Sequence, residues 1–174
     1  MIVRENLYES AYNNDMMNEF GYFNQYLSEK LNKKQFKQLV EKAKIKNINY
    51  SDVPNIIMRY DEPFKELIKI NKSEKEKLEW WKPKYLKMKK FEKEKQSDEY
   101  YYKLVEAIKD DKIDTPVIIL SIDDESGKNY KFVCGGRNRM ILSYILKKNI
   151  KCLMVVLPED KKENIDKIIQ DRNK

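Results

Sequence analysis

The chain contains no histidine among its 174 residues, and this absence excludes several kinds of chemistry. A Ser/His/Asp triad, a Cys–His pair and a His-ligated metal site all need an imidazole as base or ligand. Cysteine is almost as scarce, because Cys134 and Cys152 are the only two, and each lies in an apolar, strand-like pattern. We therefore predict two buried, reduced thiols, with neither a disulfide scaffold nor a metal site.

Long apolar runs are missing too. No segment approaches the length that a bilayer-spanning helix needs. The N-terminus also lacks the apolar stretch of a signal peptide. Together with the reduced thiols, these absences predict a cytoplasmic protein that has no membrane partner.

Charge, by contrast, is abundant, and its basic part is in excess. The 36 lysine and arginine residues outnumber the 29 aspartate and glutamate residues, which gives a net charge of +7 at neutral pH. Hydrophobic residues still make up 41% of the chain, which is enough to build a core. The basic excess fits contact with nucleic acid or nucleotides, and it equally fits a simple solubilising surface.

The first 81 residues show helical patterns only. Asn32 with Gln35, and Ser73 with Glu76, have the three-residue spacing of a capping box. Apolar residues recur every three to four positions in the segments 16–31, 36–43, 64–68 and 78–81. We therefore predict a wholly helical N-terminal region over residues 1–81, which ends where the Lys82-Pro83 pair interrupts the pattern.

Residues 84–95 interleave lysines with aromatic and aliphatic residues. Such a run can bind nucleic acid through phosphate contacts and base stacking. More often it is a solvated face whose aromatic side chains turn into the core, and here it would form part of an edge strand and a loop. Three acids further along, Asp123, Asp124 and Glu125, match no calcium loop and indicate a hairpin turn instead.

Residues 97–158 mix helical with strand patterns. Ser97 caps a helix that ends at Asp110. Apolar and alternating runs predict strands over 117–122, 130–134 and 152–157, and helical spacing predicts a helix over 137–148. The predicted fold class is α+β: a small α/β domain over 82–158 with the helical N-terminal extension, followed by a charged C-terminal helix or tail over 159–174.

Two of the four glycines lie in the turn Gly135-Gly136-Arg137-Asn138-Arg139, between the strand at 130–134 and the following helix. The first turn of a helix has backbone N–H groups without intrahelical partners, and adjacent glycines let a ligand approach them. A helix N-terminus disfavours cations, so two arginines there favour an anion, such as phosphate, between them and the backbone. The alternative is a tight turn with solvated arginines.

The order of these elements, together with the turn, resembles the ParB N-terminal and sulfiredoxin-like superfamily over residues 97–158. The segments that carry the likeness are Leu104–Ile108, Pro116–Leu120, Gly135–Arg139 and Ile150–Val156. The resemblance implies a small α/β fold whose Gly-x-x-Arg turn holds the phosphates of a nucleotide, with Gly136 and Arg139 at the family's glycine and arginine. ParB-like nucleases carry an acidic residue where this chain has Gly135, and sulfiredoxins carry a reactive cysteine where it has Arg137. Both departures speak against those two activities.

Three hypotheses of function follow. The first is a ParB-like, nucleic-acid-associated protein that binds a nucleotide or DNA phosphate at residues 135–139, with or without hydrolysis of a phosphoester. The second is a kinase-like phosphotransferase on a small molecule or modified base, with a nucleotide and Mg²⁺ as cofactors and with Asp123, Asp124 or Glu125 near the metal. The third is a catalytically silent protein that binds a protein partner through residues 1–81. The sequence identifies no catalytic residue, so it leaves nuclease, nucleotidase, phosphotransferase and non-enzyme open.

Overall fold

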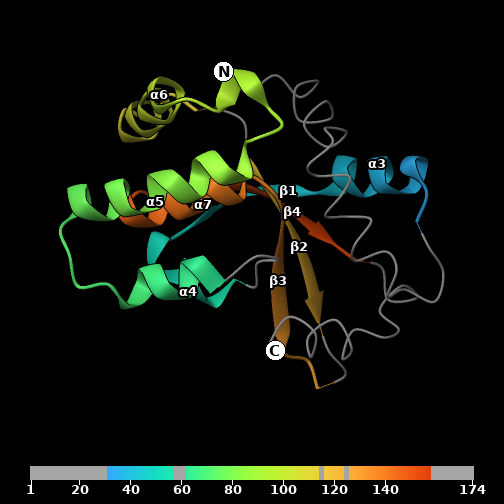
Figure 1. Ribbon diagram of the computed structural model, residues 1–174. Coiled ribbons are helices and arrows are strands. Elements are labelled where there is room, and N and C mark those ends of the chain that lie inside the picture. The colour runs from blue at the N-terminus through green and yellow to red at the C-terminus, as the bar shows by residue number, and fades with distance from the viewer. Residues whose placement is uncertain (1–30, 57–61, 114–115, 124–125, 158–174) are drawn as a thin grey trace.

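The computed structural model describes residues 31–56, 62–113, 116–123 and 126–157, so the helix predicted over 16–31 (all but its last residue) and the one over 159–174 lie outside it. Four strands form one mixed sheet in the order β1-β4-β2-β3 (Figure 1). Their bounds are Lys44–Ile48 for β1, Val117–Asp123 for β2, Asn129–Gly135 for β3 and Ile150–Val156 for β4. The strands β2 and β4 are parallel, and the two outer pairs are antiparallel.

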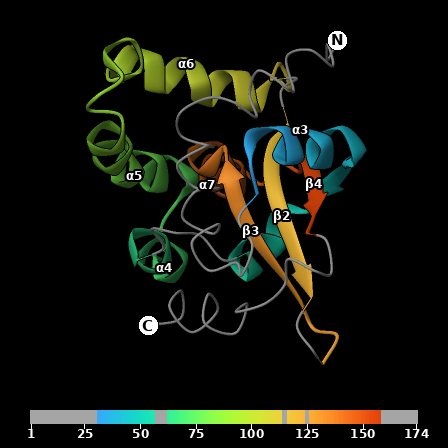
Figure 2. The same ribbon diagram turned by 90° about the vertical axis from the view of Figure 1, so that its right-hand side faces the viewer.

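Five helices accompany this sheet in the described part of the chain. They are α3 (Lys33–Lys42), α4 (Glu62–Lys69), α5 (Glu74–Met88), α6 (Asp98–Lys109) and α7 (Arg137–Leu146), with 3₁₀ turns η1 (Tyr50–Asn55) and η2 (Lys93–Lys95). Figure 2 shows α4, α5 and α6 gathered on one side of the sheet. The α+β fold class is therefore confirmed. None of the described helices combines the length and the apolar character needed to cross a bilayer.

The predicted unit of three strands and one helix is confirmed. Strands β2, β3 and β4 lie in one sheet, and α7 packs against β2 and α5. Buried side chains of α4 to α7, of η1 and of all four strands form one hydrophobic cluster, in which Trp81, Tyr85 and Tyr101 are fully buried. The predicted helix caps at Asn32, Ser73 and Ser97 each accept a backbone hydrogen bond in the first turn.

The prediction of a wholly helical N-terminal region is wrong at residues 44–48, which form β1. This strand pairs with β4, from Lys44 opposite Met154 to Ile48 opposite Ile150. Four of its five residues are exposed, so it carries no alternation of apolar and polar residues. Backbone pairing with β4 makes it a strand, and that long-range contact leaves no local signal.

The predicted helix end at Lys82-Pro83 is also wrong, because α5 continues through Pro83 to Met88. Proline removes one backbone donor and strains the preceding turn. The fully buried side chains of Trp81 and Tyr85, on either side of Pro83, hold the helix in place. Residues 84–88 are thus helical rather than an edge strand, and the predicted domain boundary at residue 81 falls inside α5; the division into domains stays a prediction.

Lys82 links α5 to α6. Its Nζ donates a hydrogen bond to the hydroxyl of Tyr102 at 3.0 Å and lies 3.2 Å from Asp98 Oδ2 and 3.3 Å from Glu79 Oε2. The Tyr102 hydroxyl in turn donates to Glu79 at 2.6 Å. These bonds raise the pKa of Lys82 and lower that of Glu79, in both cases chiefly through Tyr102. These four side chains lie near the surface and already bond one another, so they act as a structural link between the two helices.

Cys152 lies in β4 with no exposed surface, and this burial raises the pKa of its thiol. The predicted burial is thus confirmed for Cys152, whereas the side chain of Cys134 lies outside the description. In a Cys134→Ala variant, where Cys152 is the only thiol, we expect labelling by a thiol reagent to be at least about a hundredfold slower than in denaturant, because reaction requires local opening. Labelling at the denatured rate would contradict the buried position.

Candidate functional site

The Gly-Gly turn joins β3 to α7. Gly135 ends β3 opposite Ile118, and Gly136 is the residue that caps α7. Gly136 has φ 89° and ψ 27°, a left-handed conformation that side chains disfavour, and it offers no side-chain cap to the helix. The backbone N–H groups of Arg137, Asn138 and Arg139 therefore have no side-chain acceptor on the capping residue.

Strand register brings the turn together with the segment that follows α7. Gly135 pairs near the start of β2, and the start of β2 pairs near the start of β4, with Val117 opposite Cys152. The end of β3 and the beginning of β4 therefore share one edge of the sheet. The residues that flank α7 on both sides thus meet there, although the whole helix separates them in the chain.

Arg139 lies under the turn. A Cβ atom added to Gly136 would be 3.3 Å from Nη2 of Arg139 and 3.0 Å from Cγ2 of Val117, so the glycine makes room for the guanidinium. Arg139 forms no hydrogen bond or ion pair with any described residue. Burial lowers the pKa of Arg139 to about 10. A guanidinium removed from water usually has a carboxylate or phosphate partner, and this one has neither among the described residues.

Arg137 takes the opposite direction, toward α5. Its Nη1 lies 2.8 Å from the sulfur of Met88, and its guanidinium carbon lies 6.0 Å from the ring centre of Trp81. Both contacts connect α7 to the buried face of α5, and the second is a cation–π contact. The sequence predicted that an anion would lie between the two arginines and the backbone. The structure instead places the Arg137 side chain, partly buried, in helix packing.

Asn138 in the turn and Lys131 on β3 differ in their surroundings. Asn138 Oδ1 is buried and accepts no hydrogen bond from the described residues. Lys131 lies on β3 and donates to Asn129 Oδ1 at 2.7 Å. Asn138 therefore keeps unused hydrogen-bonding capacity beside the turn, whereas Lys131 already has a local partner.

The acids proposed for a metal do not lie at this turn as far as they are described. Asp123 pairs with Asn129 at the far end of β3, and Asn129 Nδ2 donates to its carboxylate at 2.8 Å. Gly135 lies six residues along the strand from Asn129, about 20 Å at 3.4 Å per residue. The expectation that Asp123 lies near the site is wrong, because the hairpin and the Gly-Gly turn are at opposite ends of β3. No described set of three acids or cysteines could hold a metal ion.

A small pocket lies beside Arg139, between the end of α6, the flank of α7 and the start of β4. Its volume is about 50 Å³, and Arg139 shares its lining with Ser143, Lys148 and Lys151. Sequence reasoning missed these three residues, since they come from the middle of α7 and from the segment after it. A wider hollow of about 500 Å³ on the outer face of α6 is open and lies away from the turn.

Comparison with known proteins adds no name to this site. No family model, curated protein or solved structure matches the chain.

Proposed function

We propose that this protein binds the phosphate of a nucleotide or nucleic acid at the turn of Gly135, Gly136, Arg137, Asn138 and Arg139. One observation carries the proposal: the guanidinium of Arg139 is largely buried against Gly136 and has no partner among the described residues. A buried cation without a counter-charge destabilises a fold, and an apolar residue would serve packing better. An anionic ligand supplies the missing partner, because a guanidinium fork matches two oxygens of a phosphate.

The backbone of the turn supports the same ligand. Gly136 opens the start of α7 without a side-chain cap, so first-turn N–H groups remain available to an oxyanion. Nη2 of Arg139 lies against Gly136, which puts charged and backbone donors at the same end of α7. The buried acceptor of Asn138 would take a bond from a hydroxyl of the ligand. Arg137 contributes to this site by holding α7 against α5.

These contacts favour binding over phosphoryl transfer. Asp123, the described member of the acidic hairpin, lies at the other end of β3 from the turn. A transferase that uses Mg²⁺ needs carboxylates beside the phosphates it acts on. The proposal is therefore a phosphate-binding protein, in which the basic surface assists nucleic acid or nucleotide ligands and the cytoplasm is the compartment that supplies them.

Arg139→Ala tests the proposal. We expect a tenfold to hundredfold loss of affinity, about 1.5–3 kcal/mol, because one charge-assisted contact disappears. Arg139→Lys keeps the positive charge but loses the planar guanidinium, so its affinity should lie between those of wild type and Arg139→Ala. The measurement is titration of ATP, GTP and a short single-stranded DNA against each protein, with a melting curve for each. If Arg139→Ala folds and binds every ligand like wild type, the turn is architecture alone.

A further inference from the structure

The pocket beside Arg139 has an excess of positive charge. Its polar lining consists of Asp111, Arg139, Ser143, Lys148, Asn149 and Lys151. Three of these residues are cations and one is a carboxylate. Arg139 and Lys151 form no ion pair with any described residue, so the positive charge of the pocket is largely uncompensated. Ser143, which is only 4% exposed, adds a hydroxyl to the same wall.

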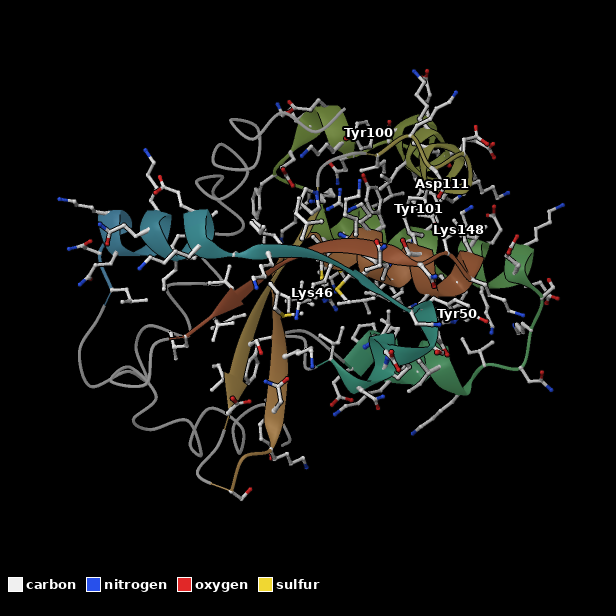
Figure 3. All side chains as sticks on the ribbon, turned by 180° about the vertical axis from the view of Figure 1, so that it is seen from behind. Lys46, Tyr50, Tyr100, Tyr101, Asp111 and Lys148 are labelled. Atoms are coloured by element: carbon white, nitrogen blue, oxygen red, sulfur yellow. The ribbon has the colours of Figure 1, made fainter. Side chains whose placement is uncertain are left out.

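The one carboxylate of the pocket is bound weakly. Asp111 Oδ2 lies 3.0 Å from Lys148 Nζ, and the two side chains point toward one another from the ends of α6 and α7 (Figure 3). The Asp111 side chain is 74% exposed, and a pair this exposed contributes little to stability. An incoming anion can therefore replace Asp111 as the partner of Lys148.

The helix ends at the pocket do not compete strongly for its cations. Helix C-termini carry partial negative charge on their last carbonyls. In α6 the carbonyls of Ala107 and Ile108 accept from the N–H groups of Lys112 and Asp111, and in α7 the carbonyl of Ser143 accepts from Lys148 N–H. These three carbonyls already have backbone partners and are not free to accept from the lysines of the pocket.

We propose that this pocket binds one terminal phosphate group, as found in a nucleotide or another phosphomonoester, through Arg139, Lys148, Lys151 and the hydroxyl of Ser143. The inference rests on the proposed function, because both use Arg139, whose Nη2 lies against Gly136 while the same residue lines the pocket. A volume of about 50 Å³ holds a few water-sized atoms, which suits the oxygens of one phosphate and excludes a nucleoside. A backbone phosphodiester has two ester chains that must both leave the pocket, so nucleic acid fits it poorly.

The test uses inorganic phosphate and phenyl phosphate as probes, with dimethyl phosphate as the diester, titrated calorimetrically into the full chain at constant ionic strength. We expect both monoester-type probes to bind and the diester to bind at least about tenfold more weakly, because it carries less charge and a second ester group. Lys151→Ala should weaken phosphate binding about three- to tenfold, and Asp111→Asn should strengthen it by a similar factor, since it removes the competing carboxylate.

Lys37→Ala is the matched control, because it removes the same charge from an exposed position on α3. Helix α3 leads into the start of β1, which pairs with Met154, whereas the pocket lies at Ile150, opposite the other end of β1. It should change phosphate affinity less than twofold. Equal affinity in wild type, Lys151→Ala and Asp111→Asn would overturn the pocket, and so would the absence of any phosphate binding. If nucleotide binding still depends on Arg139 in either case, the proposed function survives and only the subsite falls. If the diester binds as well as phenyl phosphate, the preference for a terminal phosphate is wrong.

Discussion

Replacing Arg139 with methionine should raise the free energy of unfolding of the ligand-free protein by about 1–3 kcal/mol. Burial lowers the pKa of Arg139 from its ordinary value to about 10, and each pKa unit corresponds to about 1.4 kcal/mol, reduced here because the residue is only partly buried. Methionine keeps the apolar stem and removes the charge that nothing described neutralises. Urea unfolding should show the gain, and the melting temperature should rise by several degrees.

The gain should depend on pH with a definite sign. A cation with a lowered pKa in the folded state weakens folding fully below that pKa, and the penalty vanishes as pH rises from about 10 through the higher pKa of the unfolded state. The stability difference between Arg139→Met and wild type should therefore stay constant from about pH 6 to 9 and begin to close near pH 10. A methionine variant less stable than wild type would mean that Arg139 supports the fold, which removes the main support for a phosphate site.

Replacing Gly136 with valine should destabilise the protein by about 3 kcal/mol. A left-handed backbone costs a non-glycine residue about 1–2 kcal/mol, and a branched side chain pressed into a filled space adds about as much again. The first atom of that side chain would lie 3.0 Å from Val117 Cγ2, and the same atom would displace Nη2 of Arg139 from 3.3 Å. Phosphate binding should be lost together with stability, since both depend on the open face of Gly136.

Gly127 provides the matched control for this glycine. It has nearly the same backbone angle, φ 88°, but nothing lies within 4 Å of the position of an added Cβ. Alanine at either position carries the same left-handed penalty, so the excess loss in Gly136→Ala over Gly127→Ala measures the contact with Val117 and Arg139. We expect an excess of about 1 kcal/mol in urea unfolding. Equal losses would show that the turn can relax without disturbing Arg139.

Local patterns were sufficient for the unit around α7. Apolar runs long enough for buried strands predicted β2 and β4. The cap at Ser97 and the helical spacing from residue 137 located the starts of α6 and α7 within a residue. These signals are short-range, because a cap or a buried strand depends on neighbours in the chain. The glycine pair likewise predicted the turn between β3 and α7.

Long-range contacts decided the rest. The exposed residues of β1 form a strand because their backbone pairs with β4. Helix α5 continues past Pro83 because Trp81 and Tyr85, on either side of it, are buried. Both features arise from free energy gained by distant residues, which no local pattern records. From the sequence, both arginines of the turn were predicted to contact one anion. In the structure, Arg137 packs against α5, and Arg139 has no described partner. Arg139 lies next to a pocket whose lysines follow α7 in the chain, because the strand register brings the segments on both sides of α7 to the same end of the sheet.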